Sequence, residues 1–146
     1  MAKFKKTFHI QSKDFIRAGE ASINIQNLLK SMDYDTRLVR RIAICGYEGE
    51  MNVAMHGGDG SLSLMVNDEK LILEVTDDGP GIEDIDLAMQ AGYSTAEDDH
   101  REMGFGAGMG LPNMKKNSDQ IHIESDKSKG THVQMVFFLP DGGKAD

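Results

Sequence analysis

The spacing of apolar residues predicts a strand and then a helix at the start of the chain. Residues 4–10 carry apolar side chains at a period of two, which is typical of an edge strand. From there to about Met32 the apolar positions recur at helical spacing, and Ser12 is the candidate N-cap. We therefore expect an edge strand over 4–10 and a helix that begins just after Ser12.

A second, longer helix is predicted from Asp35 to about His56, because apolar residues continue at helical spacing through this range. Gly46 and Gly49 fall inside it, and each costs about 1 kcal/mol in a helix interior relative to alanine. We therefore expect either a sheet or a ligand to pack closely against the backbone there. Cys45 is expected to be a small buried hydrophobe, and His56 a helix-terminal residue rather than a ligand.

After the second helix the pattern changes to a period of two. Residues 61–66 and 71–77 are predicted to form two strands joined by a turn-forming run at 67–70. Residues 78–110 are glycine-rich and irregular, and long irregular segments inside small domains are usually functional. The remaining predicted elements are a short helix over 110–117 and two strands over 120–125 and 131–140.

This order of elements predicts an α+β fold. A sheet with one apolar face needs helices to cover it, so we expect a two-layer sandwich in which a mixed, mostly antiparallel sheet is covered on one face by helices. The length of 146 residues is that of one domain with one core. We assign residues 1–140 to this domain and 141–146 to a polar, disordered tail.

Composition narrows the class of function. The formal net charge of −8 argues against sequence-independent binding of nucleic acid or an anionic membrane, because both need a basic surface. No apolar run approaches the roughly 18 residues that a bilayer span requires, and no leader is evident, so a cytoplasmic location is expected. A single cysteine and five histidines without short paired spacings make a zinc site unpromising.

The first candidate site lies late in the second predicted helix. Glu48 and Asn52 are four residues apart, so their side chains project from one face, one turn apart. An amide oxygen suits Mg²⁺, and a carboxylate suits proton abstraction. The alternative is an ordinary solvated polar stripe on an amphipathic helix. Glu50 points elsewhere and is expected on the surface.

The second candidate site is the end of the strand at Asp77. This residue leads into Gly79 and Gly81, so its carboxylate could accept a hydrogen bond from an amino group while the glycines let a flat ligand approach the backbone. The same Asp-Gly-Pro-Gly run is also a good turn, and both interpretations stay open.

The third candidate site is a run of alternate glycines over residues 104–110. A helix that carries Leu111 and Met114 follows directly, and the free N–H groups at such a helix start can bind an anion. The run is therefore a candidate phosphate-binding loop, and a flexible linker is the alternative.

Taken in order along the chain, four motifs resemble the N, G1, G2 and closing motifs of the gyrase, heat-shock chaperone, histidine kinase and mismatch-repair ATPases. They are Glu48-x-x-x-Asn52, Asp77-x-Gly79-x-Gly81, Gly106-x-Gly108-x-Gly110-Leu111 and Gly130-Thr131. Each signal is weak alone, but the ordered set is strong and extends from the first strand to Leu139. The resemblance implies the Bergerat ATP-binding fold, with Mg-ATP under a mobile lid over about residues 90–109.

Within that superfamily, the compact size and residues 47–56 look like the anti-sigma factor serine kinases. By this resemblance, Glu48 would be the catalytic base and Asn52 would hold Mg²⁺ against the phosphates. Asp77 would accept the adenine amino group, with support from Thr131 through water. The further nucleotide-binding residues would be Gly79, Gly81, Ile82, Gly106, Gly108, Gly110 and Leu111. The acidic run at 97–102 should repel a triphosphate, so Mg²⁺ and backbone N–H groups would carry more of the neutralisation.

The resemblance implies a cytoplasmic, ATP-dependent serine/threonine kinase that binds a sigma factor and phosphorylates an anti-anti-sigma antagonist. Two alternatives stay open: a nucleotide-gated partner-binding module without kinase activity, and a detached histidine kinase catalytic domain. The sequence also leaves a homodimer open, because Phe4, Phe8 and Phe15 could offer an apolar edge for self-pairing.

Overall fold

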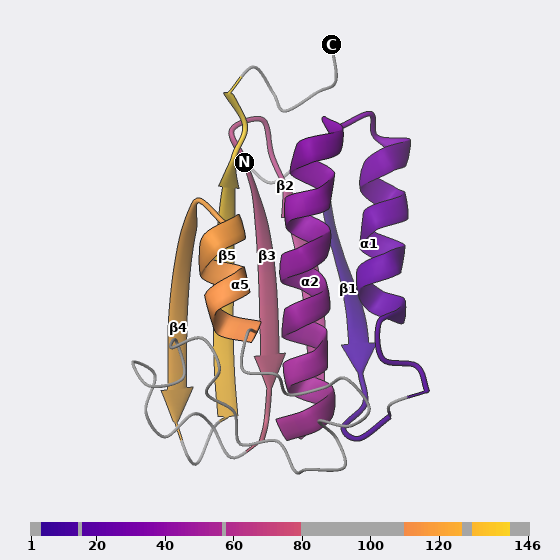
Figure 1. The fold of residues 1–146 in the computed structure, drawn as a ribbon, viewed down its shortest axis with the longest axis vertical. Coiled ribbons are helices and arrows are strands. Elements are labelled where there is room, and N and C mark those ends of the chain that lie inside the picture. Colours follow the sequence, from indigo (N-terminus) through magenta and orange to yellow (C-terminus); the bar gives the residue numbers. More distant parts are fainter. Residues whose placement is uncertain (1–3, 15, 57, 80–109, 127–129, 141–146) are drawn as a thin grey trace.

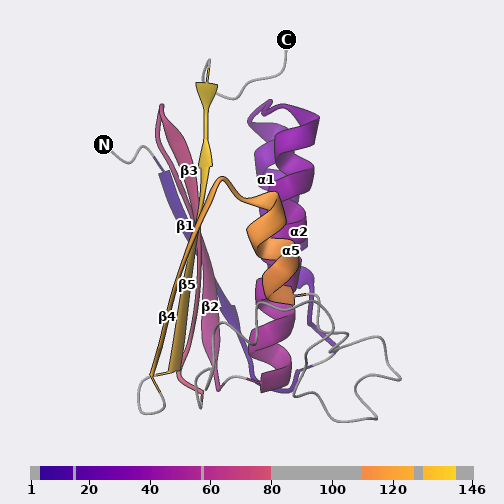
Figure 2. The same cartoon turned by 60° about the vertical axis from the view of Figure 1, so that its left-hand side comes forward.

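The computed structural model describes residues 4–14, 16–56, 58–79, 110–126 and 130–140. These residues form two layers, a five-stranded sheet and a layer of helices against one of its faces (Figures 1 and 2). The elements in chain order are β1 (Phe4–Ile10), α1 (Glu20–Ser31), α2 (Thr36–His56), β2 (Gly60–Val66), β3 (Lys70–Asp77), α5 (Gly110–Asn117), β4 (Gln120–Asp126) and β5 (Gly130–Phe138). The predicted α+β two-layer architecture is confirmed.

The strand order is β1-β2-β3-β5-β4, and every pairing among the described strands is antiparallel. Both predicted hairpins are present, β2 with β3 and β4 with β5. In the first hairpin, Asn67 Oδ1 accepts hydrogen bonds from the backbone N–H groups of Glu69 and Lys70, each at 2.8 Å, which stabilises the turn. Because β3 pairs with β5, the end of β3 lies directly beside the start of β5.

The core lies between the sheet and the helices. Alternate residues of β2 and β3, from Leu62 to Val75, are buried against the helical layer together with Val133, Met135 and Phe137 of β5. The other face carries polar cross-strand pairs, such as the Thr7 and Ser63 hydroxyls 2.9 Å apart. The helices thus cover the face on which the apolar residues are continuous.

The start of α1 differs from the sequence prediction, which placed the helix directly after Ser12. The helix begins at Glu20, and its N-cap is Gly19, whose φ is 104°. The preceding segment makes contacts with distant residues instead. The Ser12 N–H donates to Asp59 Oδ1 at 3.0 Å, and the Lys13 N–H donates to the Ala54 carbonyl oxygen at 2.8 Å. These tertiary bonds hold the segment out of a helix.

The predictions for α2 are confirmed. Asp35 lies just before its first residue and accepts a hydrogen bond from the Arg37 N–H at 2.8 Å, as an N-terminal cap should. The helix ends at His56. The sheet packs against Gly49, where a Cβ would lie 2.5 Å from Val75, whereas a Cβ on Gly46 would lie between α1 and the sheet, 3.4 Å from Ser22 and 3.7 Å from Leu62. Cys45 is fully buried, as expected.

Two properties of the described residues bear on function. None of their helices is long and apolar enough to cross a membrane. In the same part of the chain, no group of three or more His, Cys, Asp or Glu side chains is arranged to hold a metal ion.

Candidate active site

Four element ends meet at one end of the molecule. The C-terminal half of α2, the end of β3, the start of β5 and the N-terminus of α5 lie at this end in both views (Figures 1 and 2). Each of them carries one of the predicted motifs. The antiparallel pairing of β3 with β5 aligns Asp77 with Thr131, and the packing of α5 on α2 aligns Gly110 with Glu48 and Asn52.

Glu48 and Asn52 face the first residue of α5. A Cβ built on Gly110 would lie 3.1 Å from Asn52 Oδ1 and 3.4 Å from Glu48 Oε2. The prediction that the two side chains share one helix face is therefore confirmed. Since any side chain at position 110 would crowd Asn52, a glycine here keeps the helix N-terminus close to the amide and carboxylate. The arrangement places an amide oxygen, a carboxylate and a helix start around one point.

The Glu48 carboxyl is half-buried, and burial raises its pKa above the usual value for glutamate. A hydrogen bond from Asn113 opposes this rise, with Nδ2 of Asn113 3.4 Å from Glu48 Oε1. A carboxylate whose pKa is raised is a stronger proton acceptor, which suits a general base. Asn113 was not predicted from the sequence, because only the packing of α5 on α2 brings it to Glu48.

Asp77 is the last residue of β3, and it too is half-buried. Its Oδ1 accepts a hydrogen bond from the Gly79 N–H at 2.9 Å. Burial raises the pKa of Asp77, the backbone N–H groups of Gly79 and Thr131 lower it, and the neighbouring Asp78 carboxylate raises it. The ionised carboxylate has further lone pairs with which it can accept a hydrogen bond from a ligand amino group.

The start of β5 approaches the end of β3 closely. Gly130 has a φ of 90°, and a Cβ on it would lie 2.0 Å from the Asp77 carbonyl oxygen. Only glycine fits at this position without displacing the backbone. The next residue, Thr131, pairs with Asp77 across the sheet, and its hydroxyl lies 3.2 Å from that of Ser125. Thr131 is therefore beside Asp77, as the closing motif predicts.

The other predicted nucleotide-binding residues divide into two groups. Leu111 is only 6% exposed and packs in the core with Met114, so its side chain anchors α5 while its backbone belongs to the helix start. Gly81, Ile82, Gly106, Gly108 and the predicted lid over 90–109 lie outside the described residues.

Glu50 corrects the sequence prediction, which placed it on the surface. It is only 2% exposed, and its carboxylate accepts hydrogen bonds from the backbone N–H groups of Ala21 at 3.1 Å and Ser22 at 2.9 Å. The Ser22 hydroxyl donates a third bond, at 3.0 Å. Gly19, the N-cap of α1, has no side chain to accept these N–H groups, so Glu50 does so from α2.

Comparisons with known proteins find relatives over most of the chain. The sequence profile of the histidine kinase-, DNA gyrase B-, and HSP90-like ATPase family matches residues 25–142. An anti-sigma F factor of Thermoanaerobacter sp. (strain X514) is 29% identical over 135 residues, which are 88% of this chain and 87% of the relative. The anti-sigma F factor of Clostridium kluyveri (strain NBRC 12016) is 31% identical over 130 residues, 86% of this chain and 84% of the relative.

Two kinases are also similar to this chain, one in sequence and one in fold. The serine/threonine-protein kinase RsbT of Bacillus subtilis (strain 168) is 31% identical over 120 residues, 78% of this chain and 83% of the relative. The mycobacterial sensor histidine kinase MprB has the same fold, with a TM-score of 0.54 over 92% of this chain and 97% of that chain, at 14% identity. With its family profile matched over most of its length, and with its N, G1 and closing motifs meeting at one end of the fold, this chain belongs to the family of histidine kinase-, DNA gyrase B- and HSP90-like ATPases.

Proposed function

We propose that this protein is an ATP-binding anti-sigma regulatory factor that phosphorylates a serine or threonine of an anti-anti-sigma antagonist. The observation that carries the proposal is the convergence of Glu48 and Asn52 on Gly110, at the N-terminus of α5. The names of the relatives, anti-sigma F factor and serine/threonine-protein kinase, support the class of reaction and of partners. ATP and sigma factors are both cytoplasmic, and we propose that location for the protein.

The residues at the site fit Mg-ATP. The Asp77 carboxylate would accept a hydrogen bond from the adenine amino group, with Thr131 beside it. The Asn52 amide oxygen is a hard ligand that suits Mg²⁺, and the bare Gly110 backbone leaves the start of α5 open to phosphate oxygens. When bound, Mg²⁺ supplies neutralisation of the phosphate charge.

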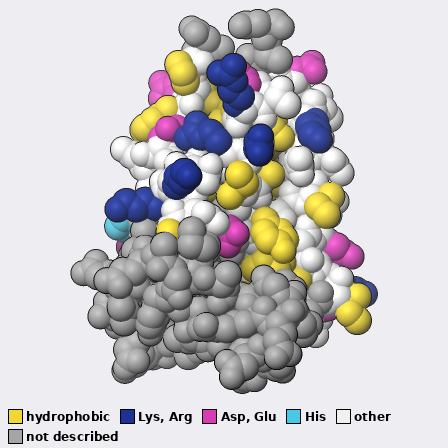
Figure 3. All heavy atoms as spheres, viewed as in Figure 1, with side chains coloured by type: hydrophobic (Ala, Val, Ile, Leu, Met, Phe, Trp, Pro, Cys, Tyr) yellow, Lys and Arg dark blue, Asp and Glu magenta, His cyan; other side chains and the backbone are white. Residues whose placement is uncertain are grey.

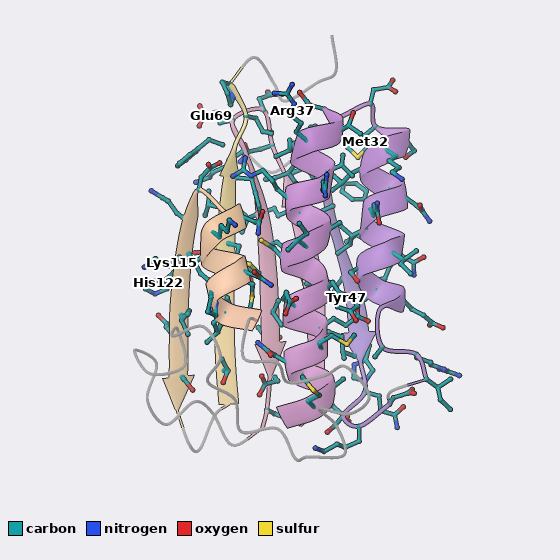
Figure 4. All side chains as sticks on the ribbon, viewed as in Figure 1. Met32, Arg37, Tyr47, Glu69, Lys115 and His122 are labelled. Atoms are coloured by element: carbon teal, nitrogen blue, oxygen red, sulfur yellow. The ribbon has the colours of Figure 1, made fainter. Side chains whose placement is uncertain are left out.

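Neutralisation by the metal matters because, among the described residues, the basic side chains gather mostly away from the site. On the described part of the helical face, most Lys and Arg side chains lie over the half of the molecule away from it (Figure 3). Arg37, near the start of α2, is one of them (Figure 4). Arg41 is held by the carbonyl oxygen of Asn117 at 2.9 Å and by Asp119 at 3.0 Å. We therefore propose that Mg²⁺ and backbone N–H groups neutralise most of the phosphate charge.

Glu48 has the properties of the base in this proposal. Its carboxylate would take the proton of the substrate hydroxyl while that oxygen bonds to the γ-phosphorus and ADP departs. A positioned base contributes about 10² to 10⁴ in rate. The elevated pKa of Glu48 makes it a better acceptor, provided that the pH keeps it ionised.

The test separates binding from transfer. Calorimetry measures the affinity for Mg-ATP, and labelled ATP measures phosphate transfer to a candidate antagonist. Glu48→Gln should keep the affinity within about threefold and lower transfer by at least about 10². Glu20→Gln, an exposed carboxylate on α1, is the matched control and should change neither. Unchanged transfer in Glu48→Gln would exclude Glu48 as the base, whereas nucleotide binding without any transfer by the wild-type protein would favour a nucleotide-gated binding module.

The stability of the phosphoprotein distinguishes the remaining alternative. Phosphoserine and phosphothreonine survive acid, whereas phosphohistidine is lost in acid and survives alkali. An acid-labile product would support a detached histidine kinase catalytic domain, whose fold this chain shares. An acid-stable product supports the proposed kinase.

A homodimer through β1 remains a proposal. β1 is a terminal strand of the described sheet, so one of its edges is free to pair (Figure 1). Phe4 and Phe8 pack partly buried against the core, and Phe15 lies outside the described residues. The edge therefore offers backbone groups flanked by Lys5 and Lys6 more than an apolar strip. Sedimentation analysis over a range of concentrations tests the dimer.

A further inference from the structure

The two oxygens of the Glu48 carboxylate have different surroundings. Oε1 lies 3.4 Å from Asn113 Nδ2, which donates a hydrogen bond to it. Oε2 faces the bare Cα of Gly110, where a Cβ would lie only 3.4 Å away. Asn52 lies on the same side as Oε2, because its amide is also beside Gly110. One oxygen is thus held by the protein, and the other is directed toward the point where the α5 N-terminus and the Asn52 amide meet.

We infer that Asn113 is a positioning residue for the base: by binding Oε1, it fixes the Glu48 carboxylate so that Oε2 is the oxygen that receives the proton. This inference rests on the proposed kinase function, since it assigns a role within that reaction. Asn113 itself stands one turn after Gly110 on α5 and needs no contact with substrate.

The helix that carries Asn113 is well anchored relative to α2. Arg41 of α2 donates through Nε to the Asn117 carbonyl oxygen at the last residue of α5, and the Cys45 thiol lies 3.6 Å from the Met114 carbonyl oxygen. The Asn117 side chain also donates to the Asn113 carbonyl oxygen at 2.9 Å. Because a side chain acts as a precise positioning group only when its support is rigid, these bonds favour the role inferred for Asn113.

An amide suits this position better than a carboxylate or an apolar side chain. Its N–H group stabilises the ionised form of Glu48 and so opposes the effect of burial on the Glu48 pKa. An apolar residue of similar size would leave Oε1 without this donor. A carboxylate would add a like charge and push the Glu48 pKa higher. The two replacements therefore affect the base in the same direction but to different extents.

The experiment compares Asn113→Leu and Asn113→Asp with the wild-type protein. The first readout is the titration of the Glu48 carboxyl by NMR in the nucleotide-free protein, which does not depend on activity. The Glu48 pKa should rise in Asn113→Leu and rise further in Asn113→Asp. The second readout is phosphate transfer from Mg-ATP to the antagonist. Here kcat should fall about tenfold in Asn113→Leu, KM for ATP should stay within about twofold, and the acid limb of the pH profile should move to higher pH.

Controls separate failure of this inference from failure of the proposed function. Lys115→Ala, an exposed change on the same helix, should leave both readouts unchanged. Asn113→Asp is nearly isosteric, so it tests the role even where Asn113→Leu does not fold. If Glu48→Gln abolishes transfer while both Asn113 variants keep the wild-type titration and kcat, the inference is overturned and the kinase proposal stands. If Glu48→Gln retains transfer, the assignment of the base fails, and the role of Asn113 falls with it.

Discussion

The buried carboxylate of Glu50 gives the sharpest prediction for stability. Glu50 comes from the C-terminal half of α2, yet it completes the N-terminus of α1 by accepting three hydrogen bonds from Ala21 and Ser22. In Glu50→Gln the side chain keeps its shape but retains only one oxygen. Its NH₂ group would then point at a backbone N–H or hydroxyl donor, which has no acceptor left.

The expected cost follows from these contacts. Loss of a hydrogen bond to a charged group costs about 1.5–3 kcal/mol, and a buried donor left without an acceptor costs about 1–3 kcal/mol. Since the two terms describe overlapping effects, we expect Glu50→Gln to lower the free energy of unfolding by about 2–4 kcal/mol. Glu50→Ala, which removes every acceptor, should cost about 3–5 kcal/mol. At about 2–4 °C per kcal/mol for a chain of this size, Tm should fall by about 4–16 °C in Glu50→Gln.

Thermal and urea unfolding followed by circular dichroism measure the effect. The matched control is Glu20→Gln, which changes an exposed carboxylate in the first turn of α1, the helix that Glu50 caps. This change should lower the free energy of unfolding by at most about 1 kcal/mol. Hydrogen exchange should also become faster at the Ala21 and Ser22 amides in Glu50→Gln than in the control. The reasoning is refuted if Glu50→Gln is as stable as Glu20→Gln, with the same protection at both amides.

Three further predictions concern other residues of α2. Burial raises the pKa of Glu48 in the folded protein above 4.5, the ordinary value expected in the unfolded chain. Between the unfolded and the folded pKa, the folded state holds more protons than the unfolded state. The free energy of unfolding therefore falls as pH rises through that window. Glu48→Gln should therefore be slightly more stable than wild type at about pH 8, by less than about 1 kcal/mol because the group is partly exposed, and this gain should vanish by about pH 4 in urea titrations; an equal gain at both pH values would contradict it. Gly49→Ala should cost about 1–3 kcal/mol because its Cβ would lie 2.5 Å from Val75 Cγ2, and adding Val75→Ala should cost less than the sum of the single changes in a double-mutant cycle; strict additivity would argue against the clash. Cys45, buried and with a pKa raised by burial to about 12, should react with a thiol reagent far more slowly in the native than in the urea-unfolded protein, and equal rates would contradict its burial.

Local signals explain which elements could be predicted from the sequence. The start of α2 depends on Asp35, which caps it from one residue away, and the first hairpin depends on Asn67, which binds the N–H groups two and three residues later. The strands were predicted from apolar residues that recur at a period of two. Each of these features is decided within a few residues, so the pattern of residue types contains the information needed to find it.

The errors came from contacts between residues far apart in the chain. Ser12 is a good N-cap by type, but the segment after it bonds to Ala54 and Asp59, about 40 or more residues away. Asn113 reaches Glu48 across 65 positions. Glu50 was placed on the surface because it projects away from Glu48, although α1 covers that side of the helix. A local pattern gives the direction of a side chain relative to its own helix, and only the fold determines what lies there.

These outcomes have one geometric basis in the register of α2. With about 100° per residue and Glu48 taken as zero, Asn52 projects at about 40°, Gly49 at about 100°, Gly46 at about 160° and Glu50 at about 200°. Glu48 and Asn52 thus face α5, Gly49 faces the sheet and Glu50 faces α1. Figure 1 shows α5 and α1 on either side of α2, with the sheet behind it. Tyr47, at about 260°, is 46% exposed on the remaining side. An insertion of one residue before position 46 would rotate all of these side chains together by about 100°, so the candidate base, the contact with the sheet and the support of α1 cannot be changed independently through the helix backbone.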